Sequence, residues 1–218
     1  MRTPSPALLR LGFTLLGTGL VAGPIGAQTA DTGTLILRAG DRDVGAETFT
    51  ITTTGTGIKL SSHAVFTGRR PAPEFTGTLD RSSGEDFAFQ LEARGGASGG
   101  QTYAVQKRNR LTVRRVARSA DQATELPGGV AVIVLADSLF APYIQIVTLA
   151  TEAGRPLTAV MLPAARRIAF IAQRSTTAEG SVTRLSGGLD GEIHLGNNGE
   201  LLRIALPGSG LEAVRARE

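Results

Sequence analysis

The sequence predicts a mainly β protein in which a curved antiparallel sheet, or half-barrel, wraps one buried helix. Three observations carry this prediction. Short segments rich in Thr, Val, Ile and Phe alternate with turn-forming clusters along most of the chain. Glycine makes up 28 of the 218 residues and separates these segments without a fixed period. One long apolar run, from 130 to 150, interrupts the series.

The expected strands follow from alternation of apolar and polar residues and from turn signals. In the segment 87–94, Phe87, Phe89 and Leu91 fall on one face. The turn Asn197-Asn198-Gly199 is the strongest hairpin signal, and the charged tail from Ala213 to Glu218 is expected to fray. The predicted strands are 34–38, 44–53, 58–66, 75–80, 87–94, 102–107, 111–118, 156–162, 166–174, 181–186, 192–195 and 200–206.

The N-terminal residues 1–27 have the pattern of a secretory signal peptide. Arg2 and Arg10 precede or border an apolar stretch, and a small-residue site for cleavage ends at Ala27. We expect cleavage near Ala27 and a periplasmic or secreted protein with a single β-rich domain over 28–218. An uncleaved anchor helix is the alternative, although the run is short and broken for a membrane span.

Composition excludes several classes of function. Removing Arg2 and Arg10 lowers the formal net charge from +4 to +2, so nucleic acid is not an expected partner. The chain has no Cys, which excludes disulfides, Cys-ligated metals and Cys nucleophiles. The fold must therefore be stabilised by its core.

The apolar run 130–150 has three interpretations: a membrane span, a strand followed by a buried helix, or the hinge of a binding cavity. Asp137 and Pro142 argue against a span, since a charge at the centre of a span costs about 2.5–3.5 kcal/mol. The β-branched residues 130–135 indicate a strand. Asp137 is a suitable N-cap for a helix that would continue to about Glu152.

That helix would be apolar on almost every face, which is typical of a buried helix. We therefore expect it inside or across the mouth of the curved sheet, with a ligand cavity beside it. The residues predicted to line this cavity are Phe140, Tyr143, Ile144 and Val147.

The search for catalytic and metal-binding motifs favours a protein that is not an enzyme and has no cofactor. Gly96 to Gly100 matches the G-x-S-x-G pattern of serine hydrolases around Ser98, and Asp137 or Asp190 and then His194 follow in the hydrolase order. The context is wrong, because a nucleophile elbow lies between a strand and a helix. His63 and His194 have no second ligand at metal spacing, so no metal site is predicted.

Charged residues give weaker indications of function than the apolar run does. The basic stretch 107–118 could meet anionic lipid head groups or an acidic partner, but a solvated strand face is the simpler interpretation. Glu47 and Asp80 are isolated acids without paired-carboxylate spacing.

Three segments together carry a resemblance to a known group of proteins. They are 45–51 (GAETFTI), 137–143 (DSLFAPY) and the ending that runs from 201–204 (LLRI) to Pro207-Gly208. The chain resembles bacterial exported β-rich domains of unknown function, similar to the domain that precedes the catalytic domain in some secreted serine α/β-hydrolases. The resemblance implies a curved antiparallel sheet around a helix, and it carries over no catalytic residue.

The leading hypothesis is a non-catalytic exported domain that binds an apolar or amphipathic, lipid-like ligand, or an envelope protein, between sheet and helix. The alternatives are an accessory module without ligand and a serine hydrolase that uses Ser98. Ligand identity, oligomeric state and pathway are left open by the sequence.

Overall fold

The computed structural model describes residues 29–68, 71–82, 84–95, 99–117 and 120–217. Within them, fifteen strands form one open, curved sheet in the order β8-β7-β6-β5-β4-β3-β2-β1-β15-β14-β13-β12-β11-β10-β9. Neighbouring strands are antiparallel apart from β9 and β10, which are parallel. The predicted mainly β, curved antiparallel sheet is confirmed. The expected signal peptide lies outside the described residues.

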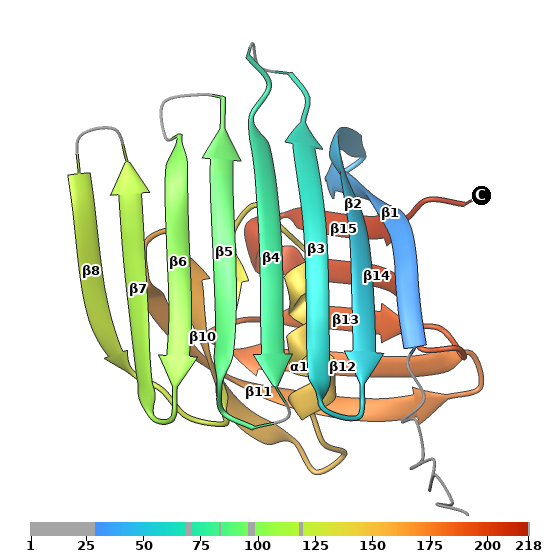
Figure 1. Cartoon of the computed structure of the whole chain (residues 1–218). Coiled ribbons are helices and arrows are strands. Elements are labelled where there is room, and N and C mark those ends of the chain that lie inside the picture. Colours follow the sequence, from blue (N-terminus) through green and yellow to red (C-terminus); the bar gives the residue numbers. More distant parts are fainter. Residues whose placement is uncertain (1–28, 69–70, 83, 96–98, 118–119, 218) are drawn as a thin grey trace, which may run out of the picture.

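The strands β1 to β8 form a continuous meander, the front half of the sheet (Figure 1). Its inward face is built by period-two alternation: in β3, Ile58, Leu60, Ser62 and Ala64 are buried and the residues between them are exposed. The strands are β1 (Thr29–Ala39), β2 (Arg42–Thr54), β3 (Gly57–Phe66), β4 (Glu74–Ser82), β5 (Phe87–Arg94), β6 (Gly100–Lys107), β7 (Arg110–Ala117) and β8 (Ala120–Pro127).

The strands β9 to β15 form the back half of the sheet. They are β9 (Val132–Ala136), β10 (Arg155–Leu162), β11 (Arg166–Thr177), β12 (Gly180–Gly187), β13 (Gly191–Leu195), β14 (Leu201–Leu206) and β15 (Leu211–Arg215), with a short 3-10 turn η2 (Pro207–Ser209) before β15. β15 pairs with β1, so Leu35 lies opposite Arg215. The expectation that the tail frays is therefore wrong for Ala213 to Arg215.

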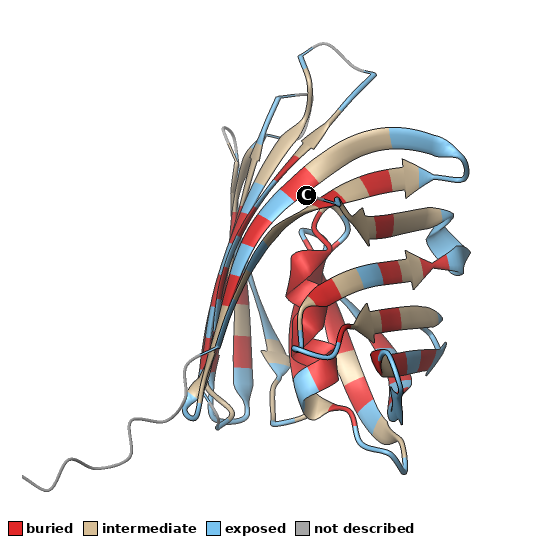
Figure 2. Cartoon of the chain, turned by 90° about the vertical axis from the view of Figure 1, so that its right-hand side faces the viewer, coloured by how far each residue is buried: buried red, intermediate tan, exposed pale blue. Residues whose placement is uncertain are grey.

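The sheet turns sharply where β1 meets β15. In Figure 1 the strands of the back half run behind the front half and across its strand direction, and in Figure 2 a short, buried helical segment lies between the two halves. No helix in the described part of the chain has the length and apolarity to cross a membrane. Residues 130–150 instead contain β9 and this helical segment.

The helical segment differs from the predicted helix. It consists of the 3-10 turn η1 (Ala141–Tyr143) and a single short helix α1 (Ile144–Leu149), not a helix from Asp137 to Glu152. The prediction of Asp137 as N-cap is wrong, because Phe140 occupies the cap position of η1 and makes no side-chain capping bond. The free backbone N–H groups there are bound by a carboxylate from the other half of the sheet.

That carboxylate belongs to Glu47 on β2. Its Oε2 accepts the N–H of Phe140 at 2.6 Å and its Oε1 accepts the N–H of Ala141 at 3.0 Å. A side chain from a distant strand thus satisfies donors that a helix start leaves open, and a local cap is not needed.

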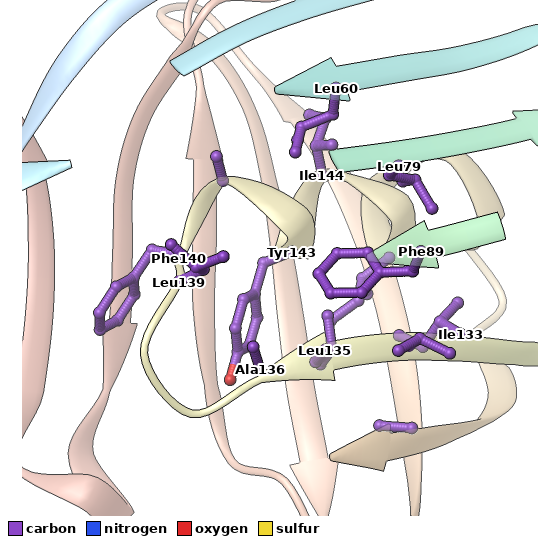
Figure 3. Packing of buried hydrophobic residues seen from close by; sticks show 14 of the residues in the cluster. Leu60, Leu79, Phe89, Ile133, Leu135, Ala136, Leu139, Phe140, Tyr143 and Ile144 are labelled. Atoms are coloured by element: carbon purple, nitrogen blue, oxygen red, sulfur yellow. The ribbon is translucent and has the colours of Figure 1, made fainter. Parts of the chain in front are cut away.

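Close packing also fixes this segment on the front half. A Cβ placed on Gly77 of β4 would lie 2.4 Å from Cδ1 of Leu139, so the leucine fills the space that the glycine leaves. The surrounding cluster combines front-half residues with residues of β9 and the helical segment (Figure 3). Its labelled members include Leu60, Leu79, Phe89, Leu135, Tyr143 and Ile144.

Candidate functional site

A cavity of about 490 Å³ lies at the upper ends of β2 to β7 in Figure 1, between the front half and two turns of the back half. We call it the rim cavity. Its size falls in the range of roughly 300–1,000 Å³ that is usual for small-molecule sites. It is lined by Val44, Phe66, Thr67, Pro73, Phe75, Leu91, Ala93, Gly100, Thr102, Arg115, Asp137, Ser138, Leu162 and Pro163.

Most of the rim cavity is apolar. Phe66 at the end of β3 and Phe75 at the start of β4 pack edge to face, with ring centroids 5.8 Å apart. Leu91 and Ala93 continue the inward face of β5 beyond Phe89. These inward positions line the cavity at the margin of the core, to which the buried Leu91 also belongs.

Polar groups gather at two places on the cavity wall. Thr102 of β6 and Arg115 of β7 face each other across a strand pair. Asp137 and Ser138 come from the turn after β9. Burial raises the pKa of Asp137 above its ordinary value, and the nearby Arg166 opposes that rise.

The four residues predicted to line a ligand cavity lie in the core. Phe140, Tyr143, Ile144 and Val147 are 2%, 3%, 6% and 3% exposed, and the rings of Phe140 and Tyr143 stack at 6.1 Å. They are not among the residues that line the rim cavity, whereas Asp137 and Ser138, just before them, are. A signal was present in the sequence: Phe66 and Phe75 lie at strand ends next to the break at Arg70 to Pro73.

Glu47, for which the sequence predicted no partner, has a structural role. It is fully buried, and this burial raises its pKa to about 7 against the lowering effect of its bonds to Phe140 and Ala141. The buried Ser62 hydroxyl also lowers the pKa of Glu47, although it does not reach standard hydrogen-bond geometry. Glu47 holds the helical segment to β2 and does not line the rim cavity.

In the structure Asp190 and His194, the acid and the histidine of the hydrolase pattern, bind other partners. Asp190 accepts the N–H of Gly187 at 2.9 Å, and His194 Nε2 lies 3.1 Å from Glu192. Ser98 lies outside the described residues. His63 is 3.9 Å from Glu74, and no group of three metal-ligating side chains occurs in the part of the chain that the structure describes.

The described part of the basic stretch, 107–117, comprises the last residue of β6, the β6–β7 turn and strand β7. Its outward side chains pair with acids on neighbouring segments: Lys107 with Asp86, Arg110 with Glu125, and Arg114 with Asp121. Arg115 differs, since it faces the rim cavity. Arg118 lies outside the described residues.

No family model and no curated protein matches the chain. Among solved structures, the chain is similar to the crystal structure of a beta-barrel-like protein of the domain of unknown function DUF1849 from Brucella abortus. The TM-score is 0.51 and the sequence identity 11%, over 87% of this chain and 95% of the other. At this identity the likeness shows the fold alone, which is beta-barrel-like.

Proposed function

We propose that this chain is an exported, non-catalytic β domain that binds an apolar or amphipathic ligand in the rim cavity. The observation that carries the proposal is the cavity itself, where eight apolar residues from both halves of the sheet surround a space of about 490 Å³. A mainly apolar hollow with a few polar groups is the usual form of a small-molecule site. The signal-peptide pattern of residues 1–27 supports export.

The exposed side chains on the cavity wall support ligand access. Arg115 and Thr67 are exposed, whereas Leu91, Thr102 and Leu162 are buried. A ligand could therefore enter from solvent and place its apolar part against the buried wall.

Ligand uptake is tested by native mass spectrometry of detergent-free protein and by calorimetric titration with dodecanol, a neutral amphipathic probe. The wild-type chain should retain lipid-like molecules or bind dodecanol. Ala93→Phe places a ring in the cavity from the inward face of β5 and should weaken dodecanol binding about tenfold or more. Ala88→Phe, on the exposed outward face of the same strand, is the matched control and should bind as the wild type does.

Two results would contradict the proposal. One is a wild-type chain that neither retains nor takes up an apolar molecule. The other is equal dodecanol affinity in Ala93→Phe and Ala88→Phe. If Ala93→Phe does not fold, Phe66→Ser tests the same site. It removes an apolar side chain from the cavity wall instead of filling the cavity, and it should also weaken dodecanol binding.

A further inference from the structure

The rim cavity extends along the sheet, across its strands. It crosses six neighbouring strands from β7 to β2, a distance of roughly 24 Å at about 4.8 Å per strand. At the β7 end it is lined by Arg115 and, on β6, by Thr102. From β5 onward the strand residues that line it are apolar: Leu91 and Ala93, then Phe75, Phe66 and Val44. The wall formed by these strands is therefore charged at the β7 end and apolar from β5 to β2, while Asp137 and Ser138 line the opposite side from the turn after β9.

Arg115 is placed at the charged end by the alternation of β7. Leu111 and Val113 are buried on the inward face, and Arg115 is the next residue on that face. The outward arginines, Arg110 and Arg114, pair with acids of β8. Among the described residues Arg115 makes no ion pair, so its guanidinium is open to a ligand.

Asp137, the acid on the cavity wall, is a weaker candidate for recognising charge. Arg166 lies near enough to interact with it, and burial disfavours its ionised form. Its backbone N–H donates to Leu162 O at 3.5 Å, which joins the turn after β9 to the end of β10. The cationic group thus has the greater capacity to bind an opposite charge.

We propose that Arg115 binds the acidic head group of an amphipathic ligand whose apolar tail lies along Leu91, Phe75 and Phe66. This inference rests on the proposed function and adds the chemical class of the ligand. A guanidinium donates two parallel hydrogen bonds to a carboxylate or phosphate, and Thr102 beside it offers a hydroxyl. The tail then extends from β7 toward β2.

The test compares four probes by calorimetric titration below their micellar concentrations: dodecanoate, dodecyl phosphate, dodecanol and dodecylamine. Wild-type protein should bind the two acids about tenfold or more tightly than dodecanol, and dodecylamine most weakly. Arg115→Gln should remove this advantage, so that the two acids bind no more tightly than dodecanol does. Arg114→Gln, which changes the outward neighbour, is the matched control and should keep the wild-type order.

Inorganic phosphate separates a lipid-like acid from a free anion. It should bind far more weakly than dodecyl phosphate, because it makes no contact with the apolar wall. Equal affinity for the acids in wild type and Arg115→Gln, a preference for dodecylamine, or tight binding of inorganic phosphate alone would overturn the inference. Dodecanol binding that survives in any of these cases would leave the proposed function standing, whereas loss of all binding would overturn both.

Discussion

The two outer strands of the sheet, β8 and β9, are consecutive in the chain but differ in burial. In β8, the six residues from Ala120 to Glu125 are exposed on both faces of the strand. In β9, the five residues from Val132 to Ala136 are all buried. One sheet therefore ends in a strand that faces water and in another that is part of the core.

Side chains donate hydrogen bonds to the backbone carbonyls on the free edge of β9. Arg81 of β4 donates from Nη1 to Val132 O at 2.9 Å and from Nη2 to Val130 O at 3.3 Å. Gln145 of α1 donates to Val134 O at 2.8 Å. These carbonyls point away from β10. The backbone groups of β9 at the alternate positions form the hydrogen bonds with β10.

The edge of β8 is instead protected by charge. Asp121 and Glu125 pair with Arg114 and Arg110 of β7, and the strand ends at Pro127. Acids and proline are common defences of an exposed edge against pairing with another strand. The comparison teaches that a buried edge needs specific hydrogen-bond donors for its backbone carbonyls. A solvated edge needs only side chains that disfavour pairing with another strand.

The largest expected effect comes from removing the donor at the buried edge. Arg81→Met keeps the length of the side chain but leaves Val132 O without a partner, and it should lower the free energy of unfolding by about 3 kcal/mol. Burial lowers the pKa of Arg81 to about 10, so the wild-type guanidinium is still charged at neutral pH. Urea unfolding followed by circular dichroism measures the difference.

The control for this substitution is Arg114→Met on β7. Its ion pair with Asp121 is exposed, so its loss should change the stability by no more than about 0.5 kcal/mol. Equal effects of Arg81→Met and Arg114→Met would show that the β9 edge does not depend on Arg81.

The second prediction concerns Glu47, which anchors the segment that covers β9. The pKa of Glu47 in the folded state, about 7, lies above the ordinary value of 4.5. The folded chain therefore holds this proton more strongly than the unfolded chain. The resulting stability is present below pH 4.5 and is lost as the pH rises through about 7.

We expect Glu47→Gln to remove this contribution to pH dependence. Between about pH 5 and about pH 8, the wild-type chain should lose on the order of 2 kcal/mol more stability than the variant. Urea unfolding at both values measures this difference. A wild-type chain whose stability rises over this interval relative to Glu47→Gln would contradict the assignment.

The sequence predicted the strands in which one face is buried and the other is not. In β3 and β5, apolar residues such as Leu60 and Phe89 recur at every second position, and both strands were found within one residue of their observed bounds. The same rule could not find β8, since both of its faces are exposed and no alternation remains. It also missed β15, whose only buried residue is Ala213.

The contacts that position the helical segment and the rim cavity lie beyond local sequence patterns. Glu47 and Phe140 are 93 residues apart, so only the fold brings the carboxylate to the start of η1. Asp137 had the residue type of a cap but lies ahead of the helical start. The predicted cavity residues were identified by their apolarity, and apolarity alone does not separate a core position such as Tyr143 from a cavity wall such as Phe75.

The smallest expected effect on stability is at the exposed edge, where the measurable result is association. Replacing Asp121 and Glu125 by Thr removes two exposed ion pairs, so the free energy of unfolding should change by no more than about 0.5 kcal/mol. The uncharged β8 edge should pair with a second copy, which light scattering detects as a mass that increases with concentration. The matched control replaces Asp80 and Glu92 by Thr, because β4 and β5 have neighbours on both sides and no free edge. If both double variants stay equally monomeric, charge is not what protects β8, and the distinction between its edge and that of β9 has another cause.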